Sequence, residues 1–161
     1  MFIRLSISIL YTLSIFLFAA SAYSQSADYG RPAGFLRMEV QPNDEKLAST
    51  PFDPFDKTLN SQIFGLTGGM SEDSGDQIKL WDAVHQTYMS AFLADETGDR
   101  EKDGRWLDSN LNPSGMVLVP GLGFFIRNNH GLPQNAYLAG KLPLDSPKTL
   151  TLYPSFNLFS Y

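Results

Sequence analysis

The sequence predicts a mostly β domain, an antiparallel sandwich or barrel of roughly eight to ten short strands with one short helix. Apolar and polar residues alternate over short runs, as they do along half-buried strands. Ten prolines and thirteen glycines punctuate these runs and supply the turns between them. The pattern lacks the crossover helices that a parallel sheet requires.

Residues 34–40 show the alternation best, because Leu36, Met38 and Val40 fall on one side of the expected strand. The same criteria predict strands at residues 46–52, 77–81, 87–93, 116–119, 123–128, 134–139 and 149–153, and a last apolar run at 156–161. The two runs at 77–81 and 87–93 are expected to pair as a β-hairpin. Pro120 and Gly121 suit the two central positions of a β-turn.

One helix is expected, over residues 56–65. Asp56 or Thr58 can accept hydrogen bonds from the free amides at its start, and Gly65 suits its C-terminal end. A helix this short is expected to cover one face or edge of a sheet.

The N-terminal residues predict export. A short N-terminal region with one positive charge, at Arg4, is followed by an apolar run and then by small residues. This order is typical of a signal peptide, and we expect cleavage by signal peptidase after Ser24. The alternative is a retained membrane anchor, which is disfavoured because serines, threonine and tyrosine interrupt the apolar run. The predicted organisation is a signal peptide at 1–24, a flexible lead-in at 25–32 and a single β-rich domain at 33–161. The protein is expected in the periplasm, at the cell surface or outside the cell, with no membrane span after signal removal.

Charge and cysteine content limit the partners and the chemistry. The chain has 12 basic and 17 acidic residues, so loss of Arg4 with the signal leaves 11 against 17, a net charge of −6. An acidic domain of this kind argues against nucleic acid and anionic membranes, and leaves polysaccharides and envelope proteins as candidate partners. The absence of cysteine removes thiol catalysis, cysteine-ligated zinc and lipid attachment to an N-terminal cysteine.

The densest group of carboxylates follows the second strand of the expected hairpin. Oxygen ligands of this type suit calcium, and the candidate ligands are Asp95, Asp99, Glu101 and Asp103. The spacing differs from an EF-hand loop, which needs glycine where Arg100 stands. A solvated charged loop is the favoured alternative, because Lys102 and Arg105 compensate the acidic charge locally.

Three aromatic residues, Trp81, Tyr88 and Trp106, are candidate ligand-binding residues, since aromatic rings offer faces for stacking on sugars. Most aromatic residues of such a domain are expected in the core. An exposed coplanar pair would favour a carbohydrate-binding module.

The two histidines, His85 and His130, both fall in predicted turns. A cleft with a carboxylate beside either one, or with two carboxylates, would favour a secreted hydrolase. The sequence contains no G-x-S-x-G nucleophile motif, and we assign no catalytic residue.

Several segments, taken in order, resemble a recurrent β-rich module of uncharacterised bacterial exported and cell-surface proteins. The resemblance rests on LASTPF, which matches L-x-S-x-P-F, on PGLGFFI, which matches P-G-x-G-F/Y-F/W-I, and on the closing NLFSY. It covers nearly the whole mature chain and implies a surface or secreted module with no assigned activity. In longer relatives the closing element leads into another copy, so we expect either that the last run closes a sheet or that the chain is truncated relative to those relatives.

These observations favour a non-catalytic exported β-sandwich module that acts in surface binding or envelope structure. A carbohydrate-binding module is the first alternative and a secreted hydrolase the second. No cofactor is predicted apart from the calcium ion considered above.

Overall fold

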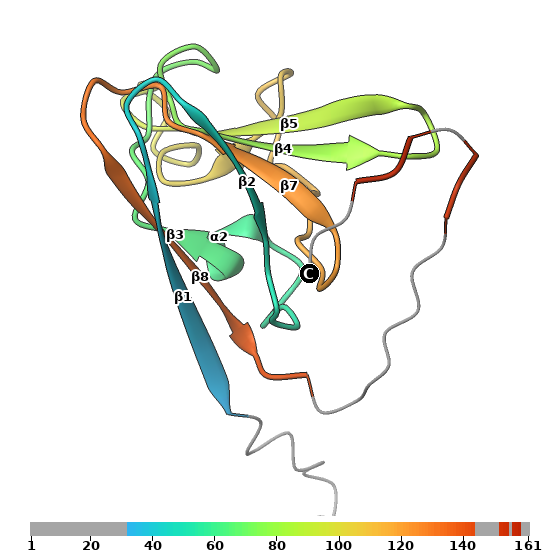
Figure 1. The fold of residues 1–161 in the computed structure, drawn as a ribbon. Coiled ribbons are helices and arrows are strands. Elements are labelled where there is room, and N and C mark those ends of the chain that lie inside the picture. Colours follow the sequence, from blue (N-terminus) through green and yellow to red (C-terminus); the bar gives the residue numbers. More distant parts are fainter. Residues whose placement is uncertain (1–31, 144–151, 155, 159–161) are drawn as a thin grey trace, which may run out of the picture. The chain divides into compact units, whose positions relative to one another are not determined.

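The computed structural model describes residues 32–143, 152–154 and 156–158, which belong to one compact unit, Pro32–Tyr161. Across these residues, eight strands form two antiparallel sheets, and α2 (Leu59–Gln62) is the one helix assigned there (Figure 1). The structure therefore confirms the predicted fold class, mostly β and antiparallel with one short helix. The predicted signal peptide and most of the lead-in lie outside the described residues.

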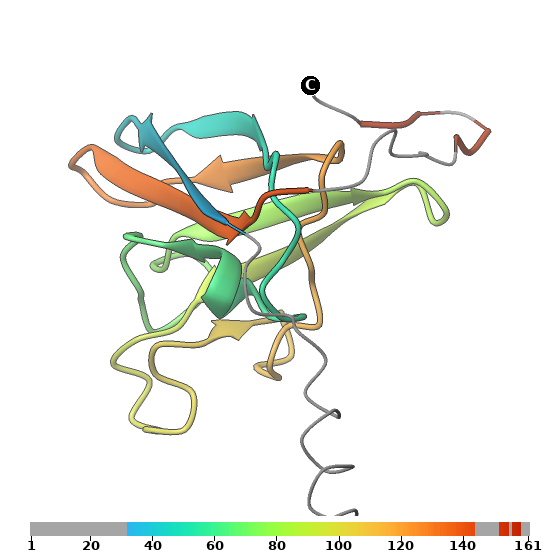
Figure 2. The ribbon, with the colours of Figure 1, turned by 90° about the horizontal axis from the view of Figure 1, so that it is seen from below.

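The smaller sheet has the strand order β1-β8-β3, and the larger sheet has the order β2-β7-β4-β5-β6 (Figure 2). The smaller sheet consists of β1 (Ala33–Val40), β8 (Gln134–Lys141) and β3 (Ile63–Phe64). The larger sheet consists of β2 (Glu45–Ser49), β7 (Gly123–Arg127), β4 (Gln77–Asp82), β5 (Thr87–Leu93) and β6 (Trp106–Leu107). Strand β1 pairs with β8, and β2 pairs with β7. In each sheet, one of the first two strands of the chain is therefore hydrogen-bonded to one of the last two.

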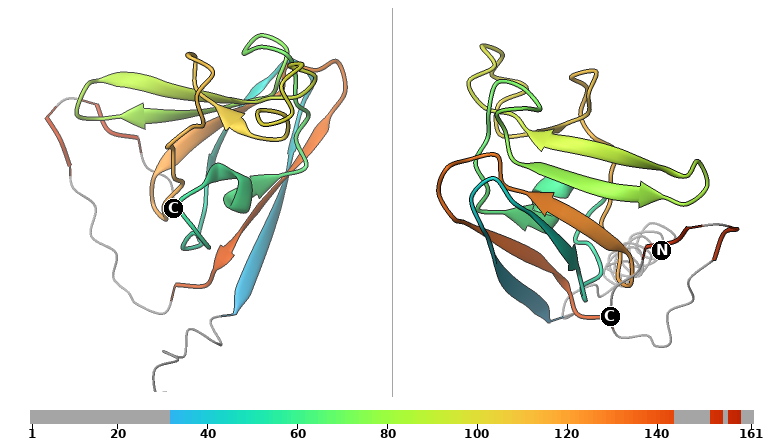
Figure 3. Two further views of the ribbon diagram at one scale, coloured as in Figure 1. Left: turned by 180° about the vertical axis from the view of Figure 1, so that it is seen from behind. Right: turned by 45° about the horizontal axis from the view of Figure 1, so that its top comes forward.

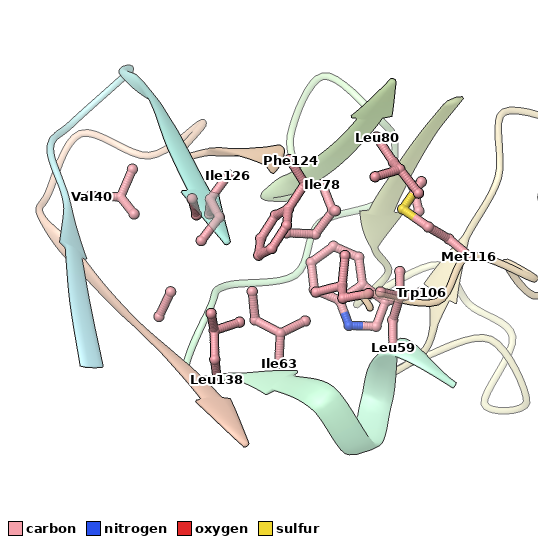
Figure 4. Close-up of a cluster of buried hydrophobic side chains, with 14 residues drawn as sticks. Val40, Leu59, Ile63, Ile78, Leu80, Trp106, Met116, Phe124, Ile126 and Leu138 are labelled. Carbon is pink, nitrogen blue, oxygen red and sulfur yellow. The ribbon is translucent and has the colours of Figure 1, made fainter. Parts of the chain in front are cut away.

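The hydrophobic core lies between the two sheets (Figure 4). The smaller sheet contributes Val40 and Leu138, and the larger sheet contributes Ile78, Phe124 and Ile126, all of them buried. Removing this apolar surface from water is the main favourable term that holds the sheets together. The arrangement is a β-sandwich.

Strand β1 follows the predicted alternation. Val40 is fully buried and Met38 packs against the core, whereas Phe35 on the opposite side is 69% exposed. Leu36 shares the side of Met38 but lies nearer the start of the strand, where it is partly exposed.

The predicted hairpin and the predicted turn are both present. Strands β4 and β5 pair from Gln77 opposite Phe92 to Asp82 opposite Thr87. At the turn before β7, the amide of Leu122 donates to the carbonyl of Val119 at 3.3 Å. Gly121 has a φ of 88°, a value that favours glycine.

The helix prediction was wrong in length. Only one turn, α2, is helical, because Ile63 and Phe64 leave the helix to pair with β8 as strand β3. Asp56 does bind the start of this turn, since its Oδ1 accepts hydrogen bonds from the Thr58 amide and the Ser61 hydroxyl.

The predicted strand at 116–119 is also wrong, although Met116 and Leu118 are buried. The buried side chain of Gln62 takes the place of a neighbouring strand: its Nε2 donates to the carbonyl of Leu118, and its Oε1 accepts from the Leu118 amide at 2.9 Å. Both polar groups of this backbone unit are satisfied without a sheet.

The final predicted strands are described only in part. Residues 149–151 and 159–161 lie outside the described residues, and no strand includes the described residues 152–153 or 156–158. We call residues 152–154 and 156–158 the C-terminal segment.

A pair of glycines lets the chain after β2 pack against the smaller sheet. Gly34 of β1 lies opposite Gly140 of β8. The ring of Phe52 lies over Gly34, and the backbone of Asp53 with Cβ of Phe52 lies over Gly140. A Cβ atom on Gly140 would lie 2.4 Å from the carbonyl oxygen of Asp53 and 2.6 Å from Cβ of Phe52. Backbone groups cannot move aside as readily as the end of a side chain, so this contact requires glycine.

We therefore expect Gly140→Ala to lower the free energy of unfolding by about 1–3 kcal/mol through overpacking. Urea denaturation followed by fluorescence measures the change. Gly115→Ala is the matched control, since no heavy atom lies within 4 Å of its new Cβ. Equal stabilities of the two variants would show that the Phe52 contact does not constrain the fold.

Candidate functional site

The outer face of the larger sheet carries aromatic residues at the β4–β5 hairpin. Ile78 and Leu80 of β4 point into the core, so Trp81 lies on the opposite face, directly across from Tyr88 of β5. Strand β7 pairs with β4 only as far as Leu80, and the hairpin therefore extends beyond the end of β7 (Figures 1 and 3).

The rings of this face meet edge to face. The Trp81 and Tyr88 centroids are 4.9 Å apart with planes at 67°, and the Tyr88 and Phe125 centroids are 6.0 Å apart at 69°. Tyr88 remains 45% exposed and Trp81 is half-buried. The structure thus brings two of the predicted aromatic residues together, but the pair is not coplanar.

Trp106, the third predicted aromatic residue, lies elsewhere. Its side chain is buried in the core with Leu59 and Met116 (Figure 4). Trp106 is only 3% exposed, so it presents little surface to a ligand in this structure, and ligand binding by Trp106 stays a prediction from the sequence. Its role is to fill space between α2 and the larger sheet.

The C-terminal segment binds the same hairpin through the backbone of Phe156. The Oε1 atom of Gln86 accepts from the Phe156 amide at 3.1 Å, and the Nε2 atom of Gln86 donates to the Phe156 carbonyl at 3.1 Å. The indole Nε1 of Trp81 donates to the same carbonyl at 2.9 Å. We call the surface formed by Trp81, Gln86, Tyr88 and Phe125 the hairpin site.

Side chains of the C-terminal segment complete the contact. The Phe156 ring meets the Trp81 ring edge to face, with centroids 5.2 Å apart. Leu158 lies against β7, where a Cβ atom on Gly123 would come within 2.9 Å of its Cγ. Sequence analysis missed Gln86 and Phe156 because the two residues are 70 positions apart and neither belongs to a recognisable motif.

A hollow of about 270 Å³ lies between the hairpin and the C-terminal segment. Its apolar lining includes Leu80, Val84, Met89, Leu122, Tyr153 and Leu158. The hollow is near the lower end of the volumes typical of ligand pockets, so it suits a side chain better than a large ligand.

A second aromatic cluster covers the outer face of the smaller sheet. Phe64 and Tyr137 are neighbours across β3 and β8, and their rings are stacked with centroids 5.6 Å apart and planes at 11°. Phe35 meets Phe64 edge to face at 6.3 Å. We call Phe35, Phe64 and Tyr137 the small-sheet patch. A hydrogen-bonded pair lies beside it, in which Nε of Arg37 donates to Oδ1 of Asn135 at 2.9 Å.

Three of the four predicted calcium ligands, Asp95, Asp99 and Asp103, accept local hydrogen bonds through their carboxylates. Asp103 accepts from the hydroxyl and amide of Thr97, and these bonds hold the pKa of Asp103 below its usual value. Asp95 accepts from the Glu96 amide, and Asp99 accepts from the Glu101 amide. Within the described ranges, no three acidic or histidine side chains converge as a metal site would require. Calcium binding by this loop stays a prediction from the sequence.

His85 lies at the tip of the hairpin, as predicted, and bonds to Asp82. Its Nδ1 is 2.6 Å from Oδ2 of Asp82, and this hydrogen bond lowers the pKa of the Asp82 carboxyl. The other oxygen of Asp82 accepts from the amides of Val84 and His85. The pair therefore builds the turn of the hairpin.

The second histidine borders a buried carboxylate. Asp76 is fully buried; its Oδ2 accepts from the Thr67 amide at 2.8 Å, and its Oδ1 accepts from the Asn129 amide at 2.9 Å. Burial raises the pKa of Asp76, and the two amides and His130 oppose that rise. Nε2 of His130 is buried and lies 3.7 Å from Oδ1 of Asp76. This carboxylate ties together the loops that precede β4 and follow β7.

Comparisons with models of known protein families, with curated proteins and with solved structures give no match to this chain. The functional proposals below consequently rest on the geometry of the chain itself. In the part of the chain that the structure describes, no helix has the length and apolar character needed to cross a membrane.

We expect Asp76→Asn to lower the free energy of unfolding by about 1–3 kcal/mol, because one of the two buried amides would then face an NH₂ group instead of an acceptor. Chemical denaturation at pH 7 measures the change. Asp44→Asn is the matched control: Asp44 is exposed and its Oδ1 accepts one amide, that of Glu45, a bond that asparagine can keep. A loss at Asp76 no larger than that at Asp44 would contradict the structural role of the carboxylate.

Proposed function

We propose that this protein is an exported β-sandwich module that binds a partner at the cell surface or in the envelope through the hairpin site, and that it acts by binding rather than by catalysis. The observation that carries the proposal is the cluster of Trp81, Tyr88 and Phe125 on the outer face of the larger sheet. The core itself does not require these rings there, because Ile78, Leu80 and Phe124 already fill its side of the same strands.

The composition of the hairpin site is typical of a binding surface. Tryptophan and tyrosine contribute large apolar area together with a polar atom, and they are enriched among the residues that dominate binding energies. Polar groups border the rings: Nζ of Lys79 lies 2.6 Å from Oε1 of Glu45 on the same face of the sheet. An aromatic centre with a polar border is the usual anatomy of a protein interface.

The two histidine–carboxylate pairs support binding over hydrolysis. Asp82 accepts two backbone amides in the hairpin turn, and Asp76 accepts two backbone amides between loops. Each carboxylate thus has a structural role that accounts for its place beside a histidine.

Photocrosslinking in producing cells tests the proposal. A benzophenone amino acid at Tyr88 is expected to form a discrete adduct in the exported fraction, and Trp81→Phe is expected to reduce its yield. The matched control is the same amino acid at Leu132, which is 72% exposed and lies in the loop before β8. Adducts of equal yield at both positions, no adduct at Tyr88, or retention of the chain in the cytoplasm would overturn the proposal. Digestion of the adduct with protease or glycosidase identifies the class of partner.

Carbohydrate binding is a second candidate, and the small-sheet patch favours it. Phe64 is 43% exposed and nearly parallel to Tyr137, and Arg37 and Asn135 supply hydrogen-bonding groups nearby. Parallel aromatic faces with polar neighbours suit the apolar faces and hydroxyls of sugar rings.

If this candidate is right, Phe64→Ala should weaken binding of a polysaccharide about ten-fold or more, because it removes one stacking ring. Calorimetry against a panel of polysaccharides measures the affinity, and Leu132→Ala serves as the exposed control. Flat isotherms for the unaltered protein across the panel would exclude this candidate without affecting the hairpin proposal.

A further inference from the structure

The contact between Gln86 and Phe156 has the chemistry of backbone recognition. A primary amide side chain carries one acceptor oxygen and an NH₂ group with two donor hydrogens. Nε2 of Gln86 donates to the Ala83 carbonyl of the turn at 2.6 Å. The oxygen of Gln86 accepts from the N–H of Phe156, and Nε2 also donates to the C=O of the same residue, at 3.1 Å each. This is the pair of bonds that a neighbouring strand would make with an extended segment. Such bonds are independent of the side chain of the bound residue, so Gln86 can hold any extended polypeptide at this point.

Trp81 adds selectivity to this contact. Its indole N–H donates to the same Phe156 carbonyl, and its ring packs edge to face against the Phe156 ring. Edge-to-face aromatic pairs contribute about 0.5–1.5 kcal/mol beyond the area they bury. An aromatic residue is therefore preferred at the position that Phe156 occupies.

A second selective position lies two residues further on. Leu158 approaches β7 at Gly123, whose lack of a side chain leaves room for it, and the amide of Gly123 donates to the Leu158 carbonyl at 3.3 Å. The hairpin site and the neighbouring part of β7 thus hold a segment of the form aromatic-x-aliphatic through its backbone at Phe156 and Leu158.

The backbone of Gln86 supports a role beyond the turn itself. Gln86 has a φ of 53°, in the left-handed region where glycine is favoured and other residues are strained by about 1 kcal/mol. Glycine would suit this backbone conformation better, whereas the amide of glutamine bonds both to the Ala83 carbonyl of the turn and to the backbone of Phe156. Strain that persists in one residue together with specific contacts of its side chain points to a function of that side chain.

The C-terminal segment leaves much of its own surface uncovered. The Phe156 side chain is 52% exposed although it is docked, and a local turn, in which Oδ1 of Asn157 accepts from the Tyr153 amide, holds the segment in shape. The bonds from Gln86 and Trp81 to this segment lie at the surface, where water can replace them, so another segment with the same groups can compete with it.

We propose that the hairpin site binds, from a partner protein, an extended polypeptide segment with an aromatic residue followed two positions later by an aliphatic one. The chain's own C-terminal segment occupies this site, through Phe156 and Leu158, as a competing intramolecular ligand. The inference rests on the proposed function and names its partner class. A polypeptide fits better than a glycan because each bond made by Gln86 and Trp81 meets a backbone amide group.

The test uses the full chain and a fluorescein-labelled peptide, LYPSFNL, which copies residues 152–158. Phe156→Ala removes the ring that holds the chain's own segment. This variant is expected to bind LYPSFNL about ten-fold more tightly than it binds LYPSANL, by fluorescence anisotropy. The unaltered chain should bind LYPSFNL about ten-fold more weakly than the variant does, because its own segment competes at high effective concentration.

A second substitution separates recognition from folding. In the Phe156→Ala background, Gln86→Gly should weaken peptide binding about ten-fold through the loss of two hydrogen bonds to the peptide. The melting temperature should change little, because relief of the left-handed strain offsets the loss of the turn bond from Nε2 to the Ala83 carbonyl. Glu96→Gly is the matched control, because Glu96 has a φ of 55° and lies outside the hairpin site. It should leave both binding and melting temperature unchanged or slightly improve the latter.

Equal affinity for the two peptides, or full affinity after Gln86→Gly, would overturn the inference. Equal affinity of the unaltered chain and the Phe156→Ala variant for LYPSFNL would show that the chain's own segment does not compete for the site. If Phe156→Ala fails to melt cooperatively, Leu158→Ala releases the other end of the segment and takes its place. Failure of peptide binding with a Tyr88 adduct still present in cells rejects only the partner class, whereas failure of both rejects the proposed function.

Discussion

The alternation of side chains along β7 and β4 constrains both the core and the candidate site. Phe124 and Ile126 point into the sandwich, which places Gly123 and Phe125 on the outer face. A shift of one residue in the pairing would exchange the two sets and bury the wrong face. Core packing therefore fixes the position of Phe125 and, through its partner strand, that of Trp81.

Glutamine side chains twice take the place of a missing strand in this fold. Gln62 bonds to the amide and carbonyl of Leu118 in the interior, and Gln86 bonds to those of Phe156 at the surface. The environment gives the two contacts different consequences. The buried contact must persist, because opening it would leave polar groups unpaired in an apolar core. The surface contact can open, because water replaces each bond that is lost.

The loops of this cysteine-free chain are tied by polar groups instead of disulfides. Asp76 is the clearest example: its backbone carbonyl accepts from the Leu93 amide, and its carboxylate accepts from the loops at Thr67 and Asn129. Burial opposes ionisation of this group, and the bonds from the amides offset that penalty. The end of the sandwich opposite the hairpin tip is thereby held without contributing to the hairpin site.

The sequence by itself determined the fold class, the β4–β5 hairpin and the turn at Pro120. These features depend on neighbours in the chain, since period-2 alternation and turn chemistry are local properties. Tertiary structure decided what depends on distant residues. Strand β8 converted the end of the expected helix into β3, the core enclosed Trp106, and the C-terminal segment brought Phe156 to Gln86. A sequence pattern shows that a ring or an amide is present, but only packing decides which group from elsewhere in the chain meets it.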